Sequence, residues 1–256
     1  MARNNAAKSK RAGGVSQVFS NWRPVIGLVK PTMRPGSLEE LVRMLPDGVG
    51  VLPLHQHIEE GREDEFEAAL EAYERAAAIL AEQGVDFIHL SGTPPFMILG
   101  REGEKKLIAR WKRKFAIETS AAPELDAAAL RALGVTKLIG VTYSEFQNEL
   151  SRDYMNEAGF DVLAMEPMKA SFAGASHLSP HSVYAHIRKT FLAHPEADGI
   201  YIQGNAWRVL SVIEMVERDF GVPVAHANCA LTWRIQKMFR INEPREGLGR
   251  LMRELP

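Results

Sequence analysis

Two glycine–polar pairs each close a short apolar run. Gly92 and Thr93 end "DFIHLSGT", and Gly204 and Asn205 end "DGIYIQGN". Glycine lets the backbone approach a ligand closely, and N–H groups at a helix start favour a carboxylate or phosphate. Thr93 and Asn205 add side-chain donors, and a helical pattern begins directly after Asn205. Each pair alone also fits a tight turn with a helix N-cap, but together they predict a site that binds an anionic substrate.

Two cations lie in the stretch "KPTMRPG", residues 30–36, which follows the first apolar run. Its two prolines favour an extended loop that carries Lys30 and Arg34. A cation there could hold a carboxylate, and arginine can do so through two parallel hydrogen bonds. The alternative is that both side chains are simply solvated. We expect Lys30 and Arg34 to bind substrate.

Tyr143 and His226 are the candidates for proton transfer. Each comes at the end of an apolar run, and a phenol can donate a proton or bind an oxyanion. Histidine is the natural proton shuttle near neutral pH. A packing tyrosine and a hydrogen-bonded structural histidine are the alternatives. We expect Tyr143 to be the proton donor and His226 to be the weaker candidate.

The sequence predicts neither a metal site nor a cofactor. Cys229 is the single cysteine, so a zinc site built from several cysteines is excluded, and we interpret this thiol as structural. His55 and His57 have a spacing that could suggest a metal, but the sequence places no third ligand beside them. There is no GxGxxG motif and no phosphate-binding loop, so no nucleotide cofactor is implied.

Short apolar runs alternate with longer helical patterns along the chain. One such pattern covers residues 63–83 and stops at Gly84. Strands that alternate with helices favour a parallel sheet with helices on both faces, which is an α/β fold. The predicted strands are residues 25–29, 49–54, 85–90, 115–119, 137–142, 161–165, 199–203 and 222–226.

The first four predicted strands resemble the last four, in the same order. The paired segments are separated by a nearly constant offset of about 110 residues, and Lys30 matches Tyr143. We therefore predict two similar parallel-sheet α/β halves, residues 23–134 and 135–256, related by an approximate twofold axis. The last helix of the first half could pack on the second half. Because ligands bind at the carboxyl ends of parallel strands, the active site is expected in the cleft between the halves.

Composition narrows the class of protein. The chain has 256 residues, 25% of them charged, and a formal net charge of −1. This balance argues against a nucleic-acid partner, and no apolar run is long enough for a membrane span. Residues 1–22 are basic and lack an apolar core, which predicts a disordered tail rather than a secretory signal. A single cysteine fits a reducing, cytoplasmic location. The sequence leaves open whether the chain forms a homo-oligomer.

Three segments resemble one known superfamily. They are the Gly-Val-Asp strand with its turn at residues 84–93, "GVTYSEFQN" at 140–148 and "VPVAHANCALTW" at 222–233. They are similar to the aspartate/glutamate racemase superfamily, and most of all to its branch of maleate cis-trans isomerases and arylmalonate decarboxylases. The resemblance covers most of residues 25–240 and implies the two-half fold with a central cleft. It also implies that Asn148, which follows Tyr143 by five residues, belongs to the substrate-binding set.

The chain departs from that superfamily at the two positions that matter most. The resemblance implies one cysteine at each of two matched strand ends, and this chain has Gly92 and Gly204 there. The decarboxylase branch is similar in having glycine at the first position, but it keeps the second cysteine. A two-cysteine racemase mechanism is therefore unavailable.

These observations lead to one expected function and one rival. We expect a cofactor-independent enzyme that acts on a small carboxylic or dicarboxylic acid through an enolate-like intermediate. A decarboxylase or another lyase is favoured slightly over a racemase, and the choice between decarboxylation and isomerisation stays open. The rival is a non-catalytic carboxylate-binding protein that kept the fold. A further possibility is a bulkier substrate that packs against an apolar wall formed by "PPFMILG" and Trp207. The sequence does not identify the substrate or its stereochemistry.

Overall fold

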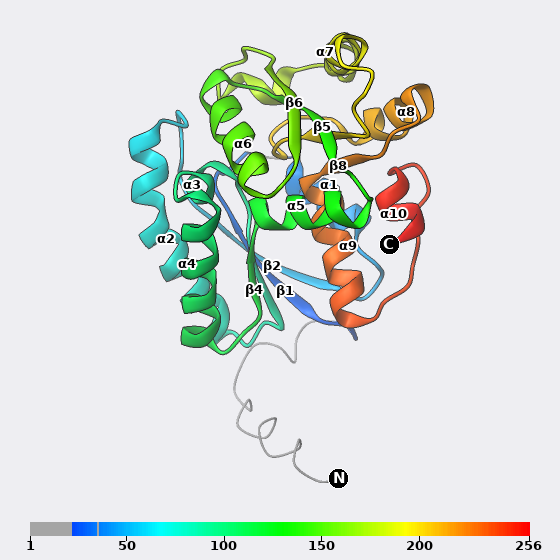
Figure 1. Cartoon of the computed structure of the whole chain (residues 1–256). Helices are drawn as coiled ribbons and strands as arrows, with labels where there is room; N and C mark the ends of the chain where they lie inside the picture. Colours follow the sequence, from blue (N-terminus) through cyan, green and yellow to red (C-terminus); the bar gives the residue numbers. More distant parts are fainter. Residues whose placement is uncertain (1–21, 35) are drawn as a thin grey trace.

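The computed structural model describes residues 22–34 and 36–256 of the chain, so the tail predicted at residues 1–22 lies almost wholly outside the described residues. The strands of the described residues form two four-stranded parallel sheets, and Figure 1 shows the helices that flank them. The order is β2-β1-β3-β4 in one sheet and β6-β5-β7-β8 in the other, so the same order occurs twice. The bounds are β1 Val25–Lys30, β2 Gly50–His55, β3 Phe87–Leu90, β4 Thr119–Ala121, β5 Lys137–Thr142, β6 Asp161–Pro167, β7 Gly199–Ile202 and β8 Val224–His226. The predicted α/β fold with two similar parallel-sheet halves is confirmed.

Helices connect the strands and cover the sheets. In the first half they are α1 Ser37–Met44, α2 Glu63–Glu82, α3 Pro94–Met97, α4 Gly100–Phe115 and α5 Ala122–Ala132. In the second half they are α6 Glu145–Glu157, the 3-10 turn η3 Gly174–His177, α7 Pro180–Ala193, α8 Leu210–Phe220, α9 Ala227–Phe239 and α10 Arg250–Glu254. No helix in the described ranges is both long and apolar enough to cross a membrane.

Two predicted boundaries are wrong. The fourth strand was expected at residues 115–119, but α4 continues to Phe115, Ala116 takes the left-handed conformation that ends it, and β4 begins at Thr119. The second error is the helix expected directly after Asn205, because α8 begins only at Leu210. The indole Nε1 of Trp207 donates to the carbonyl of Gln203 at 3.0 Å and closes a turn, so the chain bends before the helix starts.

The two halves share one hydrophobic core. One face of the first sheet, with Ile26, Leu28 and Phe87, belongs to the same buried cluster as the strands of the second sheet and Leu231 of α9. The opposite face of the first sheet packs on α2 and α4 in a separate cluster. Helix α5 follows the first sheet and packs on α9 and β8 of the second half. The inter-half boundary is therefore a packed interior.

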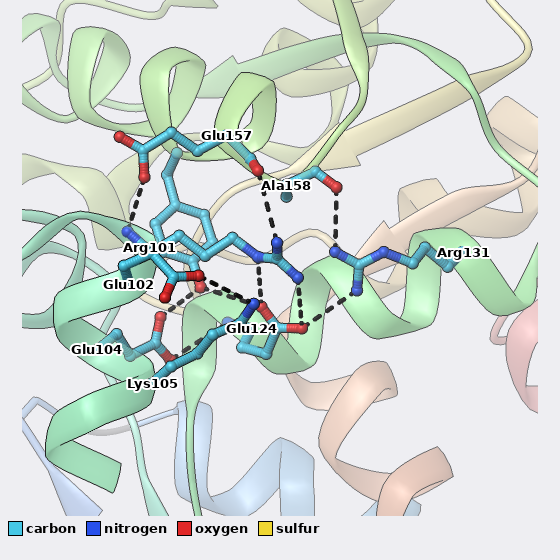
Figure 2. A network of polar contacts seen from close by, with 9 residues as sticks. Arg101, Glu102, Glu104, Lys105, Glu124, Arg131, Glu157 and Ala158 are labelled. Atoms are coloured by element: carbon cyan, nitrogen blue, oxygen red, sulfur yellow. Dashed lines mark hydrogen bonds and ion pairs between the residues drawn. The ribbon is translucent and has the colours of Figure 1, made fainter. Parts of the chain in front are cut away.

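Polar contacts tie the halves together at their rim (Figure 2). The Arg101 guanidinium of α4 binds Glu124 of α5 at 2.8 Å, while its backbone N–H donates to Glu157 of α6 at 2.8 Å. Arg131 of α5 donates to Glu124 at 3.2 Å and to the carbonyl of Ala158, just beyond α6, at 3.1 Å. Since α4 and α5 belong to the first half and α6 to the second, this network fixes their relative position.

Two buried acids lie beneath that rim. The Tyr154 hydroxyl of α6 donates to Glu104 of α4, and the Tyr201 hydroxyl of β7 donates to Asp126 of α5 at 2.9 Å. Both acids are about 1% exposed. Burial raises the pKa of Glu104 to about 7 and that of Asp126 to about 8, because the charged form loses its hydration. Both carboxyl groups therefore keep their protons to a higher pH than exposed acids do.

Candidate active site

A cavity lies at the carboxyl ends of the strands of both sheets. Its volume is about 40 Å³, which leaves room for a small group such as a carboxylate. Of the described residues, no Asp or Glu lines it, although Lys30 and Arg34 do. The lining residues are Lys30, Pro31, Thr32, Arg34, Ser37, Phe66, Gly92, Thr93, Pro94, Pro95, Tyr143, Phe172, Gln203, Gly204, Asn205 and Ala206.

Arg34 is half-buried and lines this cavity. Its two terminal nitrogens have no hydrogen bond within the described ranges, and Cζ lies 3.9 Å from the centre of the Phe172 ring. This cation–π contact joins the loop after β1 to the loop after β6 across the cleft. Burial lowers the pKa of Arg34, because the cation has lost water. A desolvated cation with unused donors is costly, and a bound anion would offset this cost.

Lys30 ends β1 and is buried, at 3% exposure. Its Nζ forms a hydrogen bond with the Ser37 hydroxyl at the first residue of α1. Burial lowers the pKa of Lys30, and the nearby carboxylates of Glu39 and Glu40 oppose this shift without overcoming it. The amine thus lies in the cavity with a neutral partner.

Tyr143 follows β5 and faces the same cavity from the second half. The Gln147 amide donates to its hydroxyl at 2.6 Å, and the Trp207 ring packs edge-on with 5.9 Å between ring centres. Burial raises the pKa of Tyr143 to about 12. The phenol is therefore neutral near pH 7, and its own proton is free to be donated.

The two strand-end glycines differ in the space around them. Both have a positive φ, 96° at Gly92 and 78° at Gly204. A Cβ at Gly92 would lie 2.9 Å from Pro31 Cγ and 3.1 Å from the hydroxyl of Tyr73, which is closer than packing allows. A Cβ at Gly204 would find Tyr143 Cε1 at an ordinary 3.6 Å. Only the second position has room for a side chain beside the cavity.

Thr93 and Asn205, the polar residues that follow the two glycines, already form side-chain hydrogen bonds. The Gln203 amide donates to the Thr93 hydroxyl oxygen across the halves, which leaves the hydroxyl proton available. The amide of Asn205 donates to Ser91 Oγ at 3.2 Å and to Asn228 Oδ1 at 3.3 Å. Thr93 can therefore still donate to a ligand, whereas the side-chain N–H groups of Asn205 hold the wall of the site.

His226 and Asn148 were expected in the site, but neither lines the cavity. His226 is fully buried at the end of β8, and burial lowers its pKa to about 4, so it is neutral and shielded from solvent. The Asn148 amide donates to the Met165 carbonyl at 2.6 Å, and its Oδ1 accepts from Thr142 at 3.1 Å. The Asn148 side chain thus links β5 and β6. His226 was expected in the cleft because it ends a strand, and Asn148 because of the family resemblance; neither argument shows which way the side chain points.

Cys229 also lies outside the cavity. It is 1% exposed on α9, with its Sγ 3.8 Å from the Leu248 carbonyl. Burial raises the pKa of this thiol, so it stays protonated. Within residues 22–34 and 36–256, no group of three His, Cys, Asp or Glu side chains could hold a metal ion.

Ser37, Gln203 and Phe172 line the cavity and were not predicted from the sequence. Ser37 follows Pro-Gly at a helix start, which is a recognisable pattern for a side chain near the carboxyl end of β1. Gln203 occupies the repeat position of Ser91, so the repeat could have indicated it. Phe172 lies in an irregular loop, and no periodic pattern marks it.

Comparisons with known proteins agree with this architecture. The family model described as arylmalonate decarboxylase matches residues 32–252. The fold is similar to that of the maleate isomerase Iso from Pseudomonas putida S16, with a TM-score of 0.84 and 18% identity over 91% of this chain and 99% of that one. Unliganded arylmalonate decarboxylase has a TM-score of 0.78 and 22% identity over 90% and 99% of the two chains.

A third structure shows a relative in a reacted state. It is a mutant of Nocardia farcinica maleate cis-trans isomerase with a covalently bound succinylcysteine intermediate. Its TM-score is 0.81, with 20% identity over 90% of this chain and 98% of that one. No curated protein sequence matches the chain significantly.

The expected resemblance is thus confirmed at the level of family and fold. The family and its structural neighbours are decarboxylases and isomerases, which supports an enzyme of that kind. Since the family match spans most of the sequence, this chain belongs to the arylmalonate decarboxylase family.

Proposed function

We propose that the chain is a cofactor-independent enzyme that acts on a small carboxylic or dicarboxylic acid through an enolate-like intermediate. One observation carries this proposal: the Arg34 guanidinium lies in a cavity without acidic side chains, and its terminal nitrogens lack hydrogen-bond partners within the described residues. A carboxylate would supply both the missing charge and two acceptor oxygens. The family match supports the same class of substrate.

The cavity has the groups that an enolate-like state needs. Arg34 binds the carboxylate that becomes the enediolate, so it stabilises the charge where that charge develops. The Thr93 hydroxyl donates a hydrogen bond to the same oxygens. Tyr143 carries a proton that can be delivered to the reacting carbon.

The missing thiols favour decarboxylation over cis-trans isomerisation. The Nocardia isomerase forms a succinylcysteine intermediate, which requires a cysteine in reach of the substrate. Here Gly92 and Gly204 occupy the strand ends, while Cys229 is buried outside the cavity. Loss of carbon dioxide from a malonate leaves an enediolate without any covalent bond to the protein, so it suits this site better.

The test is turnover of a panel of carboxylic acids that includes aryl- and alkylmalonates and maleate. Decarboxylation is followed by carbon dioxide release, and isomerisation by NMR. Arg34→Gln should weaken binding or raise KM about 10- to 150-fold, because a hydrogen bond to a charged group contributes about 1.5–3 kcal/mol. Arg188→Gln on the exposed face of α7 is the matched control and should change nothing.

A carboxylate-binding protein without catalysis is the second candidate, and the absence of thiols from both strand ends favours it. In that case acids of the panel would raise the melting temperature, and Arg34→Gln would abolish this effect, but no acid would be converted. Panel acids that neither bind nor react would contradict both functions.

A further inference from the structure

Lys30 has the position and surroundings of a proton-transfer group. It lines the cavity from the end of β1, and it also lines the smaller cavity behind, together with Ser37 and Asn205. We propose that Lys30 is a general base that removes the proton from the carbon next to the bound carboxylate, and that the Ser37 hydroxyl orients its Nζ. This rests on the proposed function and extends it from decarboxylation to proton abstraction.

The groups around Lys30 leave its amine poorly compensated as a cation. The side chain is 3% exposed, and it forms no ion pair among the residues that the structure describes. Glu39 and Glu40 of α1 are the nearest acids, but Glu39 is turned to the backbone N–H of Gly36 at 2.7 Å. The remaining titratable groups that face it are His55 on β2, His89 on β3, and Arg34 and Tyr143 across the cavity. Burial thus favours the neutral amine, which has the lone pair that a base needs.

The cavity has a second basic residue. Arg34 lines the same cavity and remains charged at any pH of interest, because the pKa of a guanidinium starts far above that of an amine. Because Arg34 binds the substrate carboxylate, Lys30 is not needed for that role. The two basic residues of "KPTMRPG" therefore divide the work, one as anion binder and one as base.

Tyr143 gives Lys30 a counterpart on the other half. Lys30 ends β1 and Tyr143 follows β5, and these strands occupy the same place in the two sheets. The two side chains line one cavity. A proton-accepting amine and a proton-donating phenol therefore approach the substrate from opposite halves, at strands next to those whose ends carry Gly92 and Gly204.

The step is a simple proton transfer. The Nζ lone pair of Lys30 forms a bond to the α-hydrogen, and the electrons of the broken C–H bond become the enediolate, which Arg34 stabilises. Lys30 is then an ammonium group. Return of a proton to the carbon, from Lys30 or from Tyr143, restores the acid, and in the second case Lys30 passes its proton to water while Tyr143 regains one.

Solvent exchange separates this step from decarboxylation. Decarboxylation begins with cleavage of a C–C bond and needs no base, whereas exchange of the α-hydrogen of a monocarboxylic acid requires one. In D₂O the wild-type protein should exchange the α-hydrogen of arylacetates or 2-arylpropionates. Lys30→Met should lower the exchange rate about 10²- to 10⁴-fold with KM nearly unchanged, since Arg34 still binds the acid. Lys189→Met on α7 is the matched control.

The variant Lys30→Arg distinguishes a general base from a residue that only binds the substrate carboxylate. Arginine keeps the positive charge and cannot accept a proton at neutral pH, so exchange should be lost although binding remains. Exchange at the wild-type rate in Lys30→Arg would overturn the proposal. Malonate decarboxylation without α-exchange in the wild-type protein would also overturn it, but would leave the proposed function intact. Binding with neither reaction would overturn both.

A direct titration tests the amine without any turnover. In protein labelled with ¹³C at lysine Cε, the Lys30 signal is assigned by its loss in Lys30→Met. It should titrate at a lower pH than the exposed lysines, and exchange should rise with pH through the same midpoint. Ser37→Ala should shift that midpoint, which a purely structural role would not do. A Lys30 signal that titrates together with the exposed lysines would refute the base.

Discussion

The buried carboxyl of Asp126 should make the free energy of unfolding depend on pH. Its carboxyl is about 1% exposed, accepts one hydrogen bond from Tyr201 at 2.9 Å, and leaves Oδ1 without a partner in the described structure. Burial raises its pKa from 3.8 to about 8. In the native protein the group therefore keeps its proton over a pH range in which the unfolded chain has lost it.

The sign of the effect on stability follows from this difference. Because the native state binds one more proton than the unfolded state, the free energy of unfolding falls as the pH rises from about 4 to about 8. The stabilising contribution of the protonated carboxyl is complete below the unfolded pKa and is lost as the pH rises through the folded one. The slope is about 1.4 kcal/mol per pH unit, or up to about 3 kcal/mol between pH 5 and pH 7.

Asp126→Asn removes this titration while its amide oxygen can still accept from Tyr201. The free energy of unfolding, measured by urea denaturation at several pH values, should therefore depend less on pH in the variant than in the wild type. Glu104 titrates in the same direction and remains in both proteins, so the comparison isolates Asp126. Asp153→Asn on the exposed face of α6 is the control and should follow the wild-type curve. Parallel curves for Asp126→Asn and wild type would show that the carboxyl is ionised in the native protein and would refute the argument.

Four further predictions concern the site. Tyr143→Phe keeps the ring and should lower kcat about 10²- to 10⁴-fold with KM little changed; steady-state kinetics decides this, and an active variant would assign the proton elsewhere. Cys229→Ser should keep turnover within a few-fold of wild type, and a thiol-alkylating reagent should inhibit weakly; loss of activity in a folded variant would place the thiol in the mechanism. Asn205→Ala removes the bonds to Ser91 and Asn228 and should destabilise the protein by about 1–2 kcal/mol in urea denaturation as well as weaken ligand binding; unchanged stability would contradict the bonds described. Gly92→Ala should destabilise more than Gly204→Ala in thermal denaturation, since its Cβ would meet Pro31 at 2.9 Å, and the reverse order would refute this packing.

The architecture was largely predictable from the sequence because apolar residues recur with the periods of strands and helices. Alternating apolar runs and helical segments indicated the class of fold, and the repeat indicated two similar parallel-sheet halves, which the structure shows as two sheets of the same strand order. The errors occurred where one side chain decides the local geometry. Trp207 closes a turn with the Gln203 carbonyl, so the helix expected after Asn205 starts later. Propensity does not report such a contact between a side chain and the backbone.

The site was predictable in its position but only partly in its membership. Strand ends placed Lys30, Arg34 and Tyr143 in the cleft, and all three line the cavity. His226 also ends a strand, yet it is fully buried and does not line it, because successive side chains of a strand point to opposite faces and the sequence did not show which face was which. Phe172 lies in a loop without periodicity, so its contact with Arg34 could be found only in the folded chain.

The core that the two halves share has a consequence for synthesis on the ribosome. Leu28 and Leu41 of the first half lie against Leu231 of α9, which is translated nearly 200 residues later. At about 5–20 residues per second, this face of the first sheet remains uncovered for on the order of ten seconds or more. A nascent chain that has completed only its first four strands therefore exposes an apolar surface that a chaperone can bind. The first sheet is finished early, but its burial waits for the last long helix.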